Sequence, residues 1–175
     1  GKKMKIKFLT MALITLGTAN LTVAAETITF VGTIEANTCT VDVGGTASPT
    51  VTLPTVGTGD LNASGDTAGA TSFTVNLSGC NGIADDVAVR FAAHNPEGAN
   101  LGINTSSTAS NVAVQLLNGN AGGNPIVFSG GIGVSEQTTT SGGTATVPLT
   151  AQYYATGATT AGSVTAVADY EVVYP

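Results

Sequence analysis

The chain has 175 residues, a length typical of one domain, and it is 42% apolar and only 9% charged. This composition excludes a disordered polyampholyte. The whole chain has a net charge of −6, but all four lysines lie within residues 2–7, so residues 8–175 carry only Arg90 against eleven acidic residues and have a net charge of −10. Such an acidic body repels polyphosphate and anionic lipid, which disfavours binding to nucleic acid or a membrane surface. We expect a protein partner or self-association.

Residues 1–24 are expected to form a removable secretory signal peptide. A basic stretch ends at Lys7, an uncharged run follows, and small residues at 23–25 favour cleavage after Ala24 or Ala25. The alternative is a membrane anchor, because the run over residues 8–25 reaches the lower limit of spanning length. Its Thr, Gly and Asn residues dilute it, so we expect an exported protein without stable membrane insertion.

Two cysteines, Cys39 and Cys80, follow this leader. In an exported chain an even pair indicates a disulfide. Two thiols without a CxxC spacing and with one distant histidine make a poor metal site. Two buried free thiols are the alternative, but they fit export poorly, so we expect a Cys39–Cys80 disulfide and no metal.

Beyond the leader, short Val-, Thr- and Ile-rich runs are broken by Gly, Asn, Ser and Pro, and no helical periodicity persists over three turns. Seven to nine such runs in a chain of this length favour an all-β sandwich. The expected strands cover residues 27–34, 39–43, 49–56, 71–80, 86–94, 111–118, 125–130, 144–155 and 162–175.

No catalytic constellation is evident. His94 is the only histidine, and no GxSxG accompanies the many serines. Asp85 and Asp86 are adjacent, so in an extended segment they point to opposite faces and cannot act as a pair. The acidic loop over residues 57–66 lacks the carboxylate spacing of an EF-hand. We therefore expect no enzyme activity, no catalytic residues and no cofactor, and a secreted hydrolase is the disfavoured alternative.

Both ends of the chain beyond the leader alternate with period two. Near the start, one side of the alternating segment consists of Ile28, Phe30, Gly32 and Ile34, and it carries three large apolar side chains. At the end, an unbroken apolar row follows Gly162 and consists of Val164, Ala166, Ala168, Tyr170, Val172 and Tyr174. Alternation alone supports ordinary core strands, but both termini are also candidate edges for pairing with another chain.

These features together resemble the type 1 class of chaperone-usher fimbrial subunits, the pilins of Gram-negative bacteria. The resemblance covers the signal peptide, the alternating extension, the cysteine pair, "TVNLSGC" over residues 74–80 and the C-terminal alternating strand. Gly162 and Tyr174 carry most weight, because that family places a glycine fourteenth from the C-terminus and a tyrosine second from it.

The resemblance implies an incomplete immunoglobulin-like Greek-key sandwich over residues 37–175, completed by a donor strand from another chain. Residues 25–36 would be the donor extension, with Ile28, Phe30, Gly32 and Ile34 entering the groove of the next subunit. The strand at the edge of the groove, which would also contact a chaperone, would contain Gly162, Val164, Ala166, Ala168, Tyr170, Val172 and Tyr174.

The implied function is that of a structural subunit of an adhesive surface fimbria, which polymerises head to tail. Its expected partners are identical or related subunits, a periplasmic chaperone and an outer-membrane usher, and its route leads through the periplasm to the cell surface. A minor or adaptor subunit and a carbohydrate-binding adhesin are the alternatives. The adhesin is disfavoured because the chain has no tryptophan and is too short for an added lectin domain.

Overall fold

The computed structural model describes residues 39–45, 49–80 and 86–174, which belong to one compact unit, Glu35–Pro175. The expected signal peptide (1–24) and donor extension (25–36) lie outside these ranges. Within them the chain forms one short 3-10 helix and ten strands. Their bounds are β1 Thr40–Val43, η1 Thr58–Leu61, β2 Thr67–Ser78, β3 Asp86–Ala93, β4 Pro96–Glu97, β5 Asn100–Gly102, β6 Val112–Asn118, β7 Ile132–Val134, β8 Thr138–Thr139, β9 Ala145–Ala155 and β10 Ala168–Val173.

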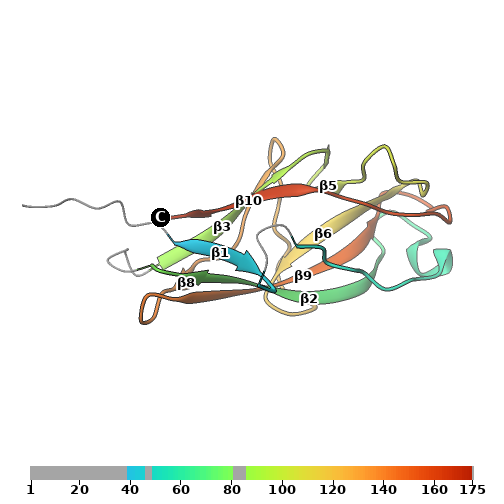
Figure 1. The fold of residues 1–175 in the computed structure, drawn as a ribbon. Coiled ribbons are helices and arrows are strands. Elements are labelled where there is room, and N and C mark those ends of the chain that lie inside the picture. Colours follow the sequence, from blue (N-terminus) through green and yellow to red (C-terminus); the bar gives the residue numbers. More distant parts are fainter. Residues whose placement is uncertain (1–38, 46–48, 81–85, 175) are drawn as a thin grey trace, which may run out of the picture. The chain divides into compact units, whose positions relative to one another are not determined.

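The strands form two sheets whose pairs are all antiparallel (Figure 1). The larger sheet has the order β1-β2-β9-β6-β5-β4. The second has the order β10-β3-β7, and β8 pairs with β3 further along its length. The predicted all-β sandwich is therefore confirmed, and the C-terminal strand β10 lies beside β3 at the edge of the second sheet.

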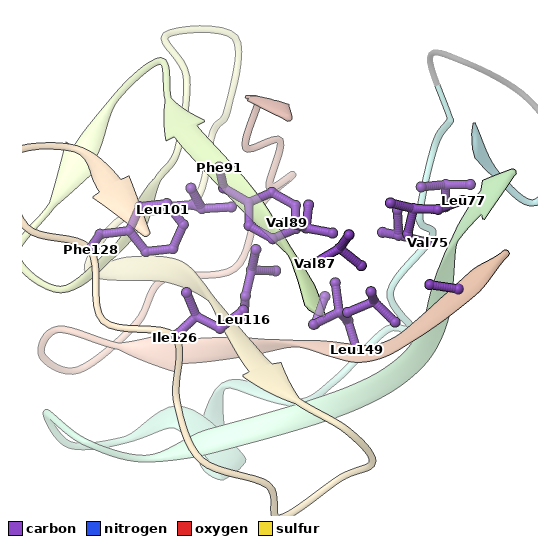
Figure 2. Close-up of a cluster of buried hydrophobic side chains, with 14 of the residues drawn as sticks. Val75, Leu77, Val87, Val89, Phe91, Leu101, Leu116, Ile126, Phe128 and Leu149 are labelled. Atoms are coloured by element: carbon purple, nitrogen blue, oxygen red, sulfur yellow. The ribbon is translucent and has the colours of Figure 1, made fainter. Parts of the chain in front are cut away.

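The core lies between the two sheets and is built by side chains that alternate along each strand. On β3, Val87, Val89 and Phe91 point inward, and Figure 2 shows them meeting Leu149 of β9 and Leu116 of β6. Val87, Val89 and Leu149 are fully buried. Each such side chain stabilises the fold by about 1.5–3 kcal/mol before entropy costs. Period-two alternation on both sheets is thus what makes the sandwich.

One side of the sandwich is closed by residues 125–128, which run beside β6; the strand predicted over residues 125–130 is not formed, and only isolated bridges occur there. The amide of Ile126 donates to Leu116 O at 2.8 Å, and Pro125 forms an isolated bridge with Leu117. Gly133 of β7 lies so close that a Cβ there would be 2.8 Å from Ile126 Cγ2. A glycine at this position lets the two sheets meet along this side.

The structure differs from the predicted strands at several places. Strands β4, β5, β7 and β8 were not predicted, because two or three residues cannot show a period. Strand β2 begins at Thr67 rather than Thr71, since Gly69 adopts a φ of +69° and a bulge between Ala68 and Thr71 continues the pairing with β9. The strand predicted over residues 49–56 is not formed: this segment belongs to no sheet, although its burial alternates over residues 49–53.

Candidate functional site

An open cleft of about 730 Å³ lies on the side of the described unit that includes β10. One wall is the extended segment 49–53 and the other is residues 164–170, which lead into β10. The floor is almost wholly apolar and comes from both sheets: Phe73, Phe91, Leu101, Val114, Leu116, Ala151 and Tyr153. The cleft therefore reaches the hydrophobic core between two extended stretches of chain.

The C-terminal wall has the alternation that the sequence predicts. Its inward residues are half-buried and pack against the core: Val164, Ala166, Ala168, Tyr170 and Val172. The intervening Thr165, Val167, Asp169 and Glu171 are exposed. Because the row from Val164 to Tyr170 lines the cleft instead of being covered from both sides, its burial stays incomplete.

One edge of this wall is occupied and the other faces the cleft. Strand β10 pairs with β3 from Ala168 opposite Ala93 to Val173 opposite Ala88. Just before β10, Val167 O accepts a hydrogen bond from the amide of His94 at 3.0 Å. Among the described residues no strand pairs with the second edge of β10. An edge of this kind can accept a further strand.

The opposite wall is an extended segment without a ladder. Val51 and Leu53 pack against the core, whereas Thr50 and Thr52 are exposed, so the segment alternates as a strand does. In the part of the chain that the structure describes, no hydrogen bond joins the backbone of residues 49–56 to another segment. The cleft is thus flanked on this side by backbone groups able to pair.

The two end positions of the predicted C-terminal row lie outside the cleft. Gly162 is in a bend before the row, where a Cβ would lie 2.3 Å from the backbone nitrogen of Ala109. Tyr174 is 41% exposed, and its hydroxyl accepts a hydrogen bond from the amide of Cys39 at 2.9 Å. Cys39 itself forms the predicted disulfide with Cys80.

Charged groups surround the C-terminal wall on its outer face. Arg90 of β3 forms an ion pair with Glu171, and His94 Nε2 lies 3.1 Å from Asp169 Oδ2. Inside the cleft, burial and, to a smaller degree, the nearby carboxylate of Asp42 raise the pKa of Tyr170 above its usual value. Tyr170 therefore stays neutral at physiological pH and presents a ring and a hydroxyl to the cleft.

The predicted donor residues Ile28, Phe30, Gly32 and Ile34 lie outside the described part of the chain. Within that part, no three side chains are grouped to hold a metal ion. Among the described residues, no helix is long and apolar enough to cross a bilayer. Sequence reasoning missed the unpaired state of residues 49–56 and the polar contacts of the loop 104–109, for which the Ser/Thr-rich run "NTSSTA" was the available signal.

These features define a β-sandwich that is closed on one side and has, on the other, a cleft with an apolar floor between residues 49–53 and 164–170. The chain belongs to the fimbrial protein family, whose model, described as "Fimbrial protein", matches residues 28–175. It is therefore a pilus component. The family is one of structural proteins rather than enzymes.

Sequence alignments with similar proteins cover most of the chain. The F17 fimbrial protein of Escherichia coli is 35% identical over 97% of this chain and 98% of its own length. The major fimbrial subunit SMF-1 of Stenotrophomonas maltophilia is 38% identical over 86% of this chain and 93% of its own.

Solved structures support the fold. The P pilus rod subunit PapA matches 78% of this chain and 99% of its own with a TM-score of 0.57 at 18% identity. The CupB6 tip adhesin of Pseudomonas aeruginosa matches 80% of this chain and 40% of its own with a TM-score of 0.63 at 24% identity. The immunoglobulin-like character predicted for the sandwich agrees with both.

Proposed function

We propose that this fimbrial subunit polymerises head to tail by donor-strand exchange, in which the cleft receives the N-terminal extension of another subunit. The observation that carries the proposal is the cleft between two extended walls, residues 49–53 and 164–170, with an apolar floor. A single strand placed there would extend β10, add a partner to residues 49–53 and cover the core.

The chain carries a segment suited to this cleft. Residues 27–34 alternate, with Ile28, Phe30 and Ile34 on one side. Burying each of these three side chains contributes about 1.5–3 kcal/mol, and each ladder hydrogen bond adds about 0.5–1.5 kcal/mol, before ordering costs. Because donor and acceptor sites are different surfaces, the interface does not close on itself and its repetition builds a filament.

An empty cleft exposes the apolar floor and an open sheet edge, which is an aggregation hazard. We therefore infer that a periplasmic chaperone covers the cleft, with contacts to Val164, Ala166, Ala168, Tyr170 and Val172, until an outer-membrane usher delivers the subunit to the surface fimbria. Gly162 and Tyr174 frame this row from its two ends. A role as a minor subunit is the alternative, because the minor fimbrial subunit HifD of Haemophilus influenzae is 35% identical over 84% of this chain.

The test uses the mature chain with residues 25–36 deleted. We expect this variant to form no filaments by negative-stain microscopy but to bind a synthetic peptide of residues 27–36. A matched peptide with Phe30→Asp should bind much more weakly, since a carboxylate would enter an apolar floor. Filaments formed by the deletion variant would overturn the proposal.

A further inference from the structure

We propose that the hydroxyl-rich loop 104–109 is a positioning element for the cleft: it holds residues 163–165 extended so that their opposite edge is ready for an incoming strand. We call Asn104, Ser107 and Thr108 of this loop the hydroxyl clamp; the amide of the next residue, Ala109, also donates to Ser163 O at 3.1 Å. The inference rests on the proposed function, because it concerns how the same cleft binds its donor.

Thr108 binds both backbone groups of Ser163, the amide and the carbonyl. The amide of Ser163 donates to Thr108 Oγ1 at 2.8 Å, and Ser163 O accepts from the amide of Thr108 at 3.0 Å. The two side-chain hydroxyls lie 3.1 Å apart. A side chain and a backbone amide of one loop residue thus make the pair of bonds that a neighbouring strand would make.

Ser107 and Asn104 do the same for Thr165. The amide of Thr165 donates to Ser107 Oγ at 3.0 Å, and Thr165 O accepts from the amide of Asn104 at 2.8 Å. Asn104 also organises the loop, since its Oδ1 accepts from the hydroxyl and the amide of Ser106 at 2.6 Å and 3.1 Å. The loop is therefore folded to present its donors and acceptors to the wall.

These contacts begin where the β-ladder stops. Regular pairing of β10 with β3 ends at Ala168 opposite Ala93, and the amide of His94 then bonds Val167 O. Beyond this point β3 has turned away, and the clamp takes its place along residues 163–165. Ile103, which directly follows β5, forms an isolated antiparallel bridge with Ala166, and the clamp continues this pairing along residues 163–165.

The clamp engages only alternate residues of the wall. Ser163 and Thr165 use their backbone groups toward the loop, so the period of an extended chain turns those of Val164 and Ala166 toward the opposite edge. This edge borders the cleft, because both residues line it. The clamp thus determines which backbone groups an incoming strand meets.

Gly162 makes this close approach possible. A Cβ at this position would lie 2.5 Å from the backbone carbon of Thr108 and 2.7 Å from Thr108 Oγ1. Only a residue without a side chain lets the connection run against the loop and bring Ser163 within hydrogen-bonding distance. The glycine that precedes the wall therefore serves the clamp instead of lining the cleft.

A wall that is already extended loses less conformational entropy when a strand binds than a wall that must be ordered first. Removing two side-chain acceptors of the clamp should therefore speed the release of a bound donor by about tenfold. The effect should appear mainly in dissociation, because the apolar floor that captures the donor is unchanged.

The test compares two double variants of the full mature chain, each assembled into filaments. Ser107→Ala with Thr108→Val removes the clamp hydroxyls. Ser110→Ala with Thr160→Val is the matched control, since it removes two hydroxyls 3.0 Å apart that lie next to the loop and before the wall but do not contact residues 163–165. Filament dissociation in guanidinium chloride is followed by gel electrophoresis, and amide hydrogen exchange of Ser163 and Thr165 by mass spectrometry.

We expect faster exchange at Ser163 and Thr165 and about tenfold faster dissociation only in the clamp variant. Equal dissociation of the clamp variant, the control and the wild type would overturn the proposal. If the double variant fails to assemble, Ser107→Ala alone provides the same comparison with a smaller expected effect. Filaments that assemble without residues 27–34 would instead refute the proposed function. In that case the hydrogen-exchange rates of Ser163 and Thr165 would still show whether the clamp holds the wall.

Discussion

The hydroxyl of Tyr174 accepts a hydrogen bond from the backbone amide of Cys39 at 2.9 Å. Tyr174 directly follows β10, and Cys39 directly precedes β1 and forms the disulfide with Cys80. The bond therefore joins the end of the second sheet to the start of the first at the disulfide. The penultimate tyrosine of the chain fixes the end of the strand that borders the cleft.

We predict that Tyr174→Phe lowers the free energy of unfolding by about 1 kcal/mol, because it removes this hydrogen bond and keeps the ring. The loss corresponds to a decrease of about 4 °C in Tm. Tyr154→Phe is the control, since the hydroxyl of Tyr154 makes no hydrogen bond within the described residues. Equal Tm values for the two variants would show that the bond contributes nothing.

The Cys39–Cys80 disulfide links residues 41 positions apart in the sequence. In the chain-entropy model a loop of this size stabilises the fold by roughly 4 kcal/mol. We expect reduction to change the mobility of the denatured chain on a gel, and Cys39→Ser with Cys80→Ser to lose most of that stability in urea denaturation. Two thiols that titrate in the denatured, unreduced protein would contradict the pairing.

We expect Gly162→Ala to be strongly destabilising for its size. The new Cβ would meet backbone atoms of Thr108 and Ala109, which cannot give way as a flexible side chain can. A loss of about 1–3 kcal/mol in urea denaturation would match overpacking of this kind. Gly59→Ala is the control, because a Cβ there meets nothing within 4 Å. The prediction fails if both alanine variants unfold at the same urea concentration.

The sheet architecture and the C-terminal wall could be predicted because a half-buried strand alternates apolar and polar residues in the sequence. The row from Val164 to Val172 alternates and packs as its pattern indicates. The same argument predicted a strand over residues 49–56, where the structure has an alternating segment outside both sheets. It could not show that this segment pairs with no strand of the described chain, because period two reports the burial of side chains and carries no information on backbone partners.

The contacts around Gly162 could not be predicted for a different reason. Thr108 and Ser163 are 55 residues apart, and their contact depends on how two connections pass each other between sheets. A run of Ser and Thr looks like any polar loop until its neighbour is known. Gly162 was identified from a family pattern, but its physical role became apparent only from the atoms around it.

Tyr170 should make stability depend on alkaline pH. Burial raises the pKa of its hydroxyl above the usual value of 10.0, so the folded state holds the proton more tightly than the unfolded state. Stability is then lost as pH rises above about 10 toward the folded pKa. We expect Tyr170→Phe to reduce this loss, relative to the wild type, in Tm measurements between about pH 8 and 11. Identical pH profiles for the variant and the wild type would contradict the prediction.

The proposed donor segment offers a positional test of register. Aromatic rings of Phe73, Phe91, Tyr153 and Tyr170 line the cleft, so a donor that fills it needs a position without a large side chain. We predict that Gly32→Leu slows filament assembly of the full mature chain at least tenfold, because the added side chain would overpack the cleft. Thr33→Leu is the matched control, since the alternation places residue 33 on the opposite side of the donor. Assembly is followed by light scattering and microscopy, and equal rates for the two leucine variants would refute the assignment of Gly32 to the face that enters the cleft.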